Sequence, residues 1–339
     1  MHKRLNKPTI GDVAKRAGVS TATVSRTLAT PDQVTAKTRA VVMKAVRDTG
    51  YVLNLAARNL RTSRAHAVLA VLPDASNIFF SQVLRGISDA LHQKGYSLVI
   101  ADTANDPERE REHGEFIQGG RVDGVLLLNG RLLSSPRTRR GREIPTVSLC
   151  ERIPGAQLPY VETANRDAAR AMTEHLFSLG HRRVGYVAGP PHNVLEHDRF
   201  AGYRDALAAR RLALDPLLVQ PGDYSIRAGE AAAAAYLNLS GLPDAVFASS
   251  DTMAMGLIRG FAAAGISVPG DISIAGFDDI EFAAAYTPAL TTVHQARHDI
   301  GARAAAMLIE LMAGRKLIDR VIQLPAELVV RESTRARVE

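Results

Sequence analysis

The sequence predicts two parts of different fold class: a small all-α domain at the N-terminus and a larger α/β body made of two lobes. Three observations predict this division. The charge is concentrated near the N-terminus, the first sixty residues contain short helical segments separated by a glycine turn, and from about residue 66 short β-rich runs alternate with helical stretches. The length of 339 residues allows two or three domains.

The composition indicates a folded protein and limits the cellular compartments in which we expect it. The chain is 46% hydrophobic and 23% charged, which is ordinary globular usage. Cys150 is the single cysteine, so no internal disulfide can form. No apolar run reaches the roughly 18 residues of a membrane span, and the N-terminus lacks the apolar stretch of a secretory signal. We therefore expect a cytoplasmic protein without a membrane partner.

The net charge of +7 is unevenly spread. Residues 1–64 hold 13 Lys and Arg against 3 Asp and Glu, a net +10, which leaves −3 for the rest. A basic domain on a slightly acidic body is expected of a protein that binds a polyanion, since each cation placed near a phosphate releases a counterion. The charge alone would also fit a solvated basic tail, so the local pattern must decide.

Residues 1–53 show the pattern of a helix-turn-helix. Thr9 can cap a first helix, with Asp12 three residues later as in a capping box. Gly18 can adopt the positive φ of a tight turn, and Ser20 can cap a second helix over 21–28. Two helices crossing around so short a turn have the geometry of a DNA-binding helix-turn-helix.

A third amphipathic helix, capped at Thr35, completes the predicted core of this head. Its expected inner side carries Val41, Val42, Ala45 and Val46.

In this geometry the start of the second helix enters the major groove, which makes three residues the expected base readers: Thr21, Ala22 and Arg26. Arg26 would form paired hydrogen bonds to guanine, and Ala22 would touch a thymine methyl group. Phosphate contacts, which position without specifying, are expected from Thr9, Ser20, Thr23, Ser25, Thr38, Arg39 and Asn54. For Thr21 and Ser25, helix capping or a phosphate contact is an alternative role.

Residues 54–65 are predicted to form a hinge helix and linker, too short a helix to be stable alone. Three segments, Val-Ser-Thr-Ala-Thr-Val-Ser-Arg at 19–26, Gly-Tyr at 50–51 and Ala-Arg-Asn-Leu at 57–60, resemble the head of LacI/GalR-family repressors. The resemblance implies that the hinge helix folds on DNA, with Ala57 and Leu60 in the minor groove and Leu60 as an apolar wedge. Packing between domains is the alternative role of Leu60.

The body, residues 66–334, is predicted to consist of parallel α/β layers. The expected strands are 67–72, 97–101, 124–128, 146–149, 184–187, 245–248 and 272–275. The expected helices lie near 80–94, 107–119, 165–180, 198–211, 226–239, 252–264 and 297–313. Ligands of such sheets bind beyond the carboxyl ends of the strands, so a cleft between the two lobes is the expected site.

The resemblance to the same family continues along the body. It is carried by Phe79-Phe80-Ser81 and by the segments 179–184, 199–203, 250–256, 276–279 and 288–293. It implies a periplasmic-binding-protein type I sensor, with two Rossmann-like lobes, that binds an effector and dimerises. The N-lobe would comprise about 66–164 and 295–324, the C-lobe about 165–294 and 325–334, and 335–339 a tail.

The resemblance also implies which residues surround the effector: Phe79, Phe80, Arg199, Tyr224, Asp278 and either Ser250 or Asp251. Glu151, at the end of a predicted strand, is a further candidate. Chemically, Arg199 supplies donors and Asp278 accepts from hydroxyl groups, so one polyol could satisfy both. The alternatives are an exposed salt bridge for Arg199, a turn cap for Asp278 and core packing for the phenylalanines. Cys150 stands where relatives often carry a polar residue.

The sequence therefore predicts a transcription regulator, most simply a homodimeric repressor, that binds double-stranded operator DNA under control of a small polar metabolite. Segments 77–81, 188–190, 222–224 and 333–336 resemble most a family member that responds to a nucleoside, which implies a nucleoside, pentose or other sugar as effector. No cofactor or metal is expected, because no phosphate loop, nucleophile elbow or metal-ligand spacing is present. An enzyme and a transport binding protein are the rival interpretations.

Overall fold

A computed structural model describes the chain except for residues 1–7, 53–63, 134–140, 142 and 338–339. The chain divides into two compact units, Met1–Arg64 and Ala65–Glu339, called here the head and the body. The predicted hinge helix, with Asn54, Ala57 and Leu60, lies outside the described residues.

The head contains the three helices that the sequence predicts: α1 (Ile10–Ala17), α2 (Thr21–Ala29) and α3 (Ala36–Thr49), with a 3₁₀ turn η1 (Pro31–Gln33) before α3. Thr9 caps α1 in a reciprocal capping box with Asp12, and Gly18 ends it at φ 66°. Ser20 caps α2 by accepting a hydrogen bond from the Thr23 amide. These local signals are independent of tertiary contacts, which is why they could be predicted.

The core of the head is small and lies between the three helices. Its buried apolar residues are Val13, Ala14, Val24, Val42 and Ala45. The prediction that Val41 faces inward was wrong, because its side chain is 42% exposed. Val41 and Val42 are adjacent and point about 100° apart on a helix, so only one can meet the core.

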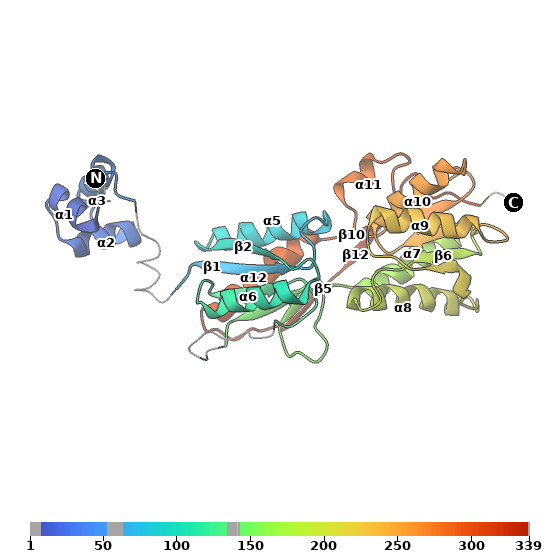
Figure 1. Cartoon of the computed structure of the whole chain (residues 1–339), viewed down its shortest axis with the longest axis horizontal. Helices are drawn as coiled ribbons and strands as arrows, with labels where there is room; N and C mark the ends of the chain where they lie inside the picture. Colours follow the sequence, from blue (N-terminus) through green and yellow to red (C-terminus); the bar gives the residue numbers. More distant parts are fainter. Residues whose placement is uncertain (1–7, 53–63, 134–140, 142, 338–339) are drawn as a thin grey trace. The chain divides into compact units, whose positions relative to one another are not determined.

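The N-lobe is a six-stranded sheet of order β11-β5-β4-β3-β1-β2, parallel throughout. Its strands are β1 (Ala67–Leu72), β2 (Ser97–Asp102), β3 (Gly124–Leu127), β4 (Thr146–Leu149), β5 (Tyr160–Thr163) and β11 (Val321–Leu324). Helices α5 (Phe79–His92) and α12 (Arg297–Met312) pack on one face, and α6 (Pro107–Gln118) covers the other (Figure 1).

The C-lobe repeats this architecture on a smaller scale. Its four-stranded parallel sheet has the order β7-β6-β8-β9, with β6 (Val184–Val187), β7 (Val219–Gln220), β8 (Ala245–Ala248) and β9 (Ser273–Ala275). Helices α7 (Asn165–Ser178) and α8 (Val194–Ala209) pack on one face. Helices α9 (Ile226–Leu237) and α10 (Asp251–Ala263) pack on the other, and a 3₁₀ turn η2 (Pro216–Leu218) and α11 (Glu281–Ala285) complete the lobe.

Within the described chain, the backbone passes between the lobes three times: from β5 to α7, from β10 (Thr292–Gln295) to α12, and from β11 to β12 (Ala326–Val329). Strands β10 and β12 pair antiparallel as a ribbon. The end of the chain is held on the C-lobe, where the Arg335 amide donates to the Ser273 hydroxyl and the Arg337 amide to the Leu179 carbonyl. The predicted tail therefore belongs to this lobe as far as residue 337.

The predicted all-α head and two parallel α/β lobes are confirmed. The sequence missed the short strands β5, β7, β10 and β11, whose two to four residues carry too little periodicity. It also placed the start of α8 four residues late. Asn193 caps that helix, with its side-chain oxygen accepting from the amides of Leu195 and Glu196.

Candidate functional site

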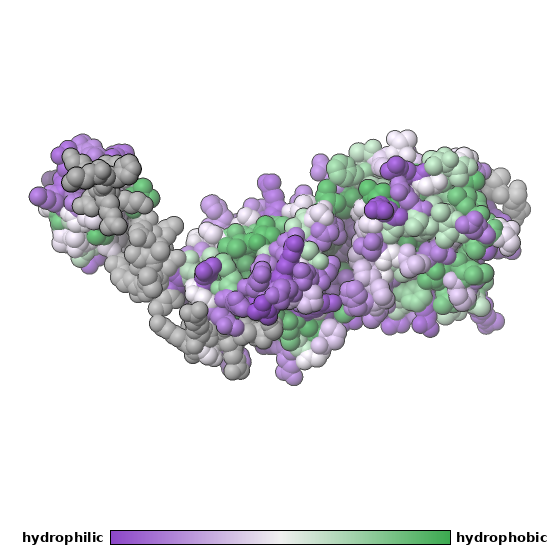
Figure 2. All heavy atoms as spheres, in the orientation of Figure 1, coloured by the Kyte–Doolittle hydropathy of each residue, from purple (hydrophilic) through white to green (hydrophobic). Residues whose placement is uncertain are grey.

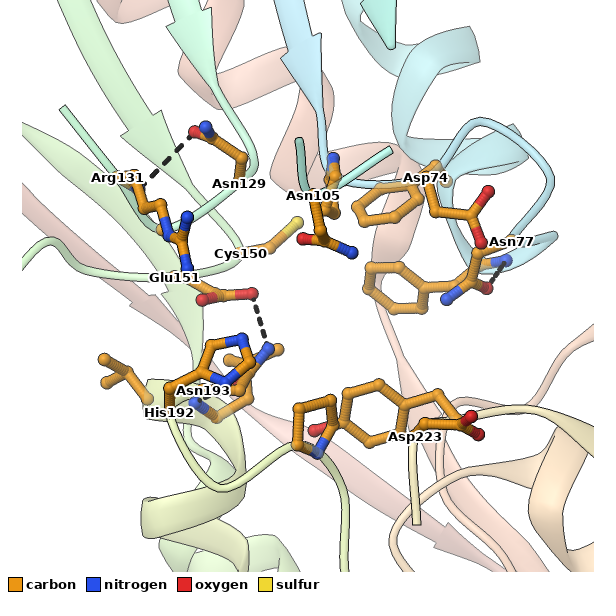
Figure 3. A pocket seen from close by; sticks show the side chains of 18 of the residues that line it. Asp74, Asn77, Asn105, Asn129, Arg131, Cys150, Glu151, His192, Asn193 and Asp223 are labelled. Carbon is orange, nitrogen blue, oxygen red and sulfur yellow. Dashed lines mark hydrogen bonds between the residues drawn. The ribbon is translucent and has the colours of Figure 1, made fainter. Parts of the chain in front are cut away.

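A cavity of about 490 Å³ lies between the two lobes, beyond the carboxyl ends of the parallel strands (Figure 3). The lining residues drawn from predicted sites are Phe79, Phe80, Glu151, Arg199, Tyr224 and Asp278. The other lining residues are Pro73, Asp74, Asn77, Asn105, Asn129, Gly130, Arg131, Cys150, Pro154, Pro190, His192, Asn193, Val194, Leu195 and Asp223. The structure thus brings six of the eight predicted effector residues together.

Arg199 forms part of the C-lobe side of the cavity and is 2% exposed, so it is not a surface ion pair. Its Nε donates to the Asn165 side-chain oxygen at 2.9 Å, and its Nη1 donates to the Ser249 carbonyl at 2.5 Å. The guanidinium lies 3.8 Å from the centre of the Phe277 ring. These contacts fix the guanidinium plane, which leaves a rigid set of donors for a ligand.

Asp278 faces Arg199, with 3.5 Å between its Oδ1 and Nη2 of the arginine, and the Gln295 amide donates to the same oxygen at 2.7 Å. Burial raises the pKa of Asp278 to about 6, against the opposing charges of Arg199 and Arg297. A carboxyl group held beside a guanidinium can accept from one ligand hydroxyl while the arginine donates to another.

Ser250 and Asp251, the other two predicted residues, do not line the cavity. Ser250 caps α10. Asp251 is fully buried, accepting from the Ile280 amide at 2.8 Å and from the Thr292 hydroxyl. Burial and the neighbouring charge of Asp278 raise the pKa of Asp251. Their observed hydrogen bonds are therefore to other parts of the C-lobe, and direct contact with an effector stays a prediction for both residues.

Phe79 and Phe80 form an apolar wall on the N-lobe side, with ring centres 5.3 Å apart in an edge-to-face pair. They belong to the hydrophobic core, which confirms their core-packing role, and they also line the cavity. Contact with an effector stays a prediction for them. Tyr224 supplies a third aromatic ring from the C-lobe. Such flat faces suit a sugar or base ring.

Glu151 reaches across the cavity from the end of β4, and its Oε1 accepts from the Asn193 side chain at 2.9 Å (Figure 3). Burial raises the pKa of Glu151 to about 7, with the Asn193 hydrogen bond and the charges of Arg199 and Arg131 opposing. Gly130, at φ 66°, presses against this carboxyl group, and a β-carbon there would collide with it.

Sequence reasoning missed most of the polar wall. Four of its residues follow a parallel strand by two or three residues, which is where side chains gather at a sheet's carboxyl edge: Asp74, Asn105, Asn129 and Asp223. Their position directly after parallel strands could have identified these four residues as candidates from the sequence. Asn193 could have been found through its helix-capping role, which places it at the same edge.

The predicted base readers Thr21, Ala22 and Arg26 are exposed along α2 of the head. Of the predicted phosphate-contacting residues, four also serve as caps or as partners of caps: Thr9, Ser20, Thr23 and Thr38. The hydroxyl of Thr9 pairs with Asp12, that of Ser20 with Thr23 at 2.9 Å, and that of Thr38 with the cap Thr35 at 3.0 Å. Capping orients these hydroxyls at helix N-termini, where phosphate also binds.

Arg39 and Ser25, the remaining described phosphate candidates, are partly exposed. Arg39 lies 3.6 Å from Asp32 in an ion pair whose aspartate is 95% exposed.

Among the described residues, no group of three or more His, Cys, Asp or Glu side chains could hold a metal ion. In the same part of the chain, no helix is both long and apolar enough to cross a lipid bilayer.

A basic helix-turn-helix head joined to a two-lobed body with a polar cleft defines a class: DNA-binding regulators that carry a ligand sensor. Two family models match the chain, "Bacterial regulatory proteins, lacI family" over residues 9–54 and "Periplasmic binding protein-like domain" over 173–334. The chain belongs to the lacI family of bacterial transcriptional regulators, which are not enzymes.

Among curated relatives, the HTH-type transcriptional repressor CytR of Escherichia coli K12 is 37% identical over 335 residues, 98% of each chain. This match over nearly the whole chain confirms the resemblance to a repressor of this family that the sequence predicted. A structure of the lac repressor dimer bound to operator and an anti-inducer matches at TM-score 0.86 and 28% identity, covering 98% of this chain and all of that one. A transcriptional regulator CelR–cellobiose complex matches at TM-score 0.73 and 32% identity, covering 96% of this chain and all of that one.

Proposed function

We propose that two copies of this chain bind a pseudo-palindromic operator and that a neutral, hydroxyl-rich metabolite, a nucleoside or a pentose, controls the affinity. The observation that carries this proposal is the cleft, where donors and acceptors for hydroxyl groups meet aromatic faces from both lobes. Because its partner is genomic DNA, the protein would act in the cytoplasm.

The head supports direct readout by α2. Thr21, Ala22 and Arg26 lie on its exposed side, and the caps of α1, α2 and α3 point polar hydroxyl groups outward. In the proposed complex Arg26 reads guanine, and Thr9, Ser20, Thr23, Ser25, Thr38 and Arg39 contact phosphates. Asn54 would add a phosphate contact, and Ala57 and Leu60 a minor-groove wedge, from outside the described residues.

An apolar patch on the N-lobe supports dimerisation. It lies over β2 and α5 (Figure 2), where β2 is an edge strand whose Ile100 is 50% exposed. An exposed apolar edge is a liability unless a partner covers it. The lac repressor structure, which aligns over nearly the whole chain, is a dimer on its operator.

The charges of the cavity favour a neutral effector. Four acidic side chains line it: Asp74, Glu151, Asp223 and Asp278. The arginines that line it are Arg131 and Arg199, and Arg199 is already paired with Asp278. A phosphorylated ligand would find no uncompensated buried cation among these described residues. The CelR relative was solved as a complex with cellobiose, an uncharged sugar, which supports a neutral effector for this chain.

A ligand that contacts both lobes would stabilise one lobe arrangement and so change the spacing of the two heads. Such coupling is reciprocal: a ligand that weakens operator binding must itself bind more weakly to the operator complex.

The test is a thermal-shift screen of the full chain with uridine, cytidine, adenosine, ribose, xylose, cellobiose and uridine monophosphate. We expect at least one neutral compound to raise the melting temperature and the nucleotide to fail. Asp278→Asn should reduce the shift. Equal affinity of the responding compound with and without operator would refute the proposed coupling.

A further inference from the structure

An ion pair joins the two lobes beside the effector cavity. Arg152, which follows β4 in the N-lobe, contacts Asp198 on α8 of the C-lobe through two parallel hydrogen bonds of 2.6 and 3.0 Å. Arg152 also lies 3.3 Å from Glu162 of β5, in its own lobe. The guanidinium is thus shared between a carboxylate of each lobe.

The geometry of this pair requires one particular lobe arrangement. Two parallel N–H···O bonds form only when the planar guanidinium and the carboxylate lie in register, and a displacement of about 1 Å breaks one of them. The adjacent residue makes a second contact of the same kind, because Glu151 accepts from Asn193 at the N-terminus of α8. Residues 151 and 152 therefore hold the first turns of α8 against the N-lobe.

The first turns of α8 also form the C-lobe side of the cavity. Asn193 caps the helix, and Leu195 and Arg199 line the cavity. Asp198 immediately precedes Arg199, so its side chain fixes the part of the helix that presents the guanidinium. A contact that holds α8 in place holds this wall of the effector site in place too.

A second pair on the same helix provides the comparison. Asp205 is contacted by Arg166 of α7 through two hydrogen bonds of 2.6 and 3.0 Å, the same distances as for Asp198. Both aspartates lie on α8 and both are held by two parallel bonds, but Arg166 and Asp205 belong to one lobe. Loss of the Asp205 pair removes a similar interaction without releasing the lobes.

We propose that Arg152 and Asp198 form an interlobe clasp that holds the lobes together in the absence of ligand and thereby sets the resting operator affinity. Glu162 keeps Arg152 in place when the lobes separate. The first half of the proposal concerns the body alone, and the link to DNA rests on the proposed function.

The clasp holds the arrangement that a ligand bridging the cavity would favour. Breaking it lowers the population of the closed, binding-competent state, so ligand affinity falls by the same factor. Operator affinity moves in the direction opposite to the effect of the ligand. For a partly exposed ion pair we expect a change of about two- to tenfold in either affinity.

The test measures lobe separation directly, without ligand or DNA. Two exposed residues, Glu112 on α6 and Ala208 on α8, are replaced by cysteines that carry a donor and an acceptor dye. Cys150 is buried and is therefore protected from reaction with the dyes. In this labelled full chain, Asp198→Asn should increase the mean dye separation and Asp205→Asn should leave it unchanged. An unchanged separation in Asp198→Asn overturns the clasp.

Operator affinity is measured on a DNA fragment selected from a random library by the wild-type protein. Arg152→Gln, Asp198→Asn and the double variant should shift its Kd equally, because either change removes the same pair. Arg166→Gln and Asp205→Asn should shift neither Kd nor lobe separation. A changed separation with unchanged Kd overturns the link to DNA, whereas failure to select any fragment overturns the proposed function and leaves the clasp to be decided by the dyes.

Discussion

At the scale of single residues, burial raises the pKa of carboxyl groups that line the cavity. Glu151 is the clearest case, since its carboxyl group is enclosed by Gly130 and Asn193 and its pKa rises from 4.5 to about 7. Between these pH values the folded chain binds a proton that the unfolded chain has released. The stabilising contribution is therefore fully present below pH 4.5 and is lost as the pH rises through 7.

Glu151→Gln removes this titration and keeps the shape of the side chain. Relative to wild type, the variant should gain up to about 3 kcal/mol of unfolding free energy between about pH 5 and about pH 8. Urea unfolding at the two pH values measures the gain, with the exposed Glu112→Gln as control. A difference between variant and wild type that is independent of pH would show that Glu151 is not held neutral.

In the head, we expect Arg26 to read a base and Arg39 to contact a phosphate. Arg26→Ala should relax preference at one base pair at a cost of about 1 to 3 kcal/mol, whereas Arg39→Ala should weaken binding to all sequences similarly and lower the salt dependence. Binding to the selected operator and to its single-base variants, at two salt concentrations, measures both. If Arg26→Ala left sequence preference intact, α2 would not be the reading helix.

At the scale of elements, the sequence predicted what local chemistry determines. The caps Thr9, Ser20 and Thr35 and the long amphipathic helices of the body could be predicted because each depends on neighbouring residues. The strands β10 and β11 could not be predicted, because their partners lie far along the chain and each strand directly precedes a lobe crossover. Their assignment needs the tertiary fold.

The site was predicted in part for the same reason. Family resemblance located Arg199 and Asp278 in the cleft, since the motifs around them are local, and the strand-end position of Glu151 made it a candidate too. The capping role of Asn193 could have placed it at this edge, but its contact with Glu151 and the contact of Asp198 with Arg152 could not be inferred, because no sequence pattern relates 151–152 to α8 across more than forty residues.

The packing of α5 on α12 depends on glycines at the crossing. Gly301 lies against the backbone of Val83, and a β-carbon there would collide with the Val83 carbonyl. Gly301→Ala should therefore destabilise the body by about 1 to 3 kcal/mol or more. Ala306→Ser, which adds one heavy atom on the exposed face of α12, should change stability by less than about 0.5 kcal/mol.

Chemical unfolding of both variants checks this prediction. Equal stabilities would mean that the two helices can separate slightly at no cost, and the close crossing would then not matter for the N-lobe.

At the scale of the whole molecule, the proposed function depends on two copies acting together. In the proposed complex each head contributes one reading helix, and a dimer places two of them on half-sites about one helical turn apart. The lobes of each copy must then be fixed to the lobes of the other, or a change of cleft angle could not alter the distance between the heads. Dimerisation is therefore part of the proposed regulatory mechanism.

The two edges of the N-lobe sheet offer a matched test of where the copies meet. Ile100 on β2 and Val321 on β11 are each 50% exposed, and β2 and β11 are the opposite edge strands of the one sheet. On the β2 edge, Leu98 lies on the same face of the sheet as Ile100 and is partly buried, so the apolar surface continues there, whereas the residue at the corresponding position beside Val321 in β11 is Gln323. The apolar edge is the better interface.

Ile100→Glu should therefore convert the dimer to a monomer at micromolar concentration, because a buried carboxylate without a partner costs several kcal/mol. Val321→Glu should leave the dimer intact. Sedimentation velocity gives the oligomeric state, and the monomeric variant should bind the selected operator at least tenfold more weakly while its melting temperature with a responding ligand still rises. If both variants remain dimeric, the copies meet elsewhere on the body; if Val321→Glu alone dissociates, the opposite edge is the interface and the hydrophobic continuity of β2 has another purpose.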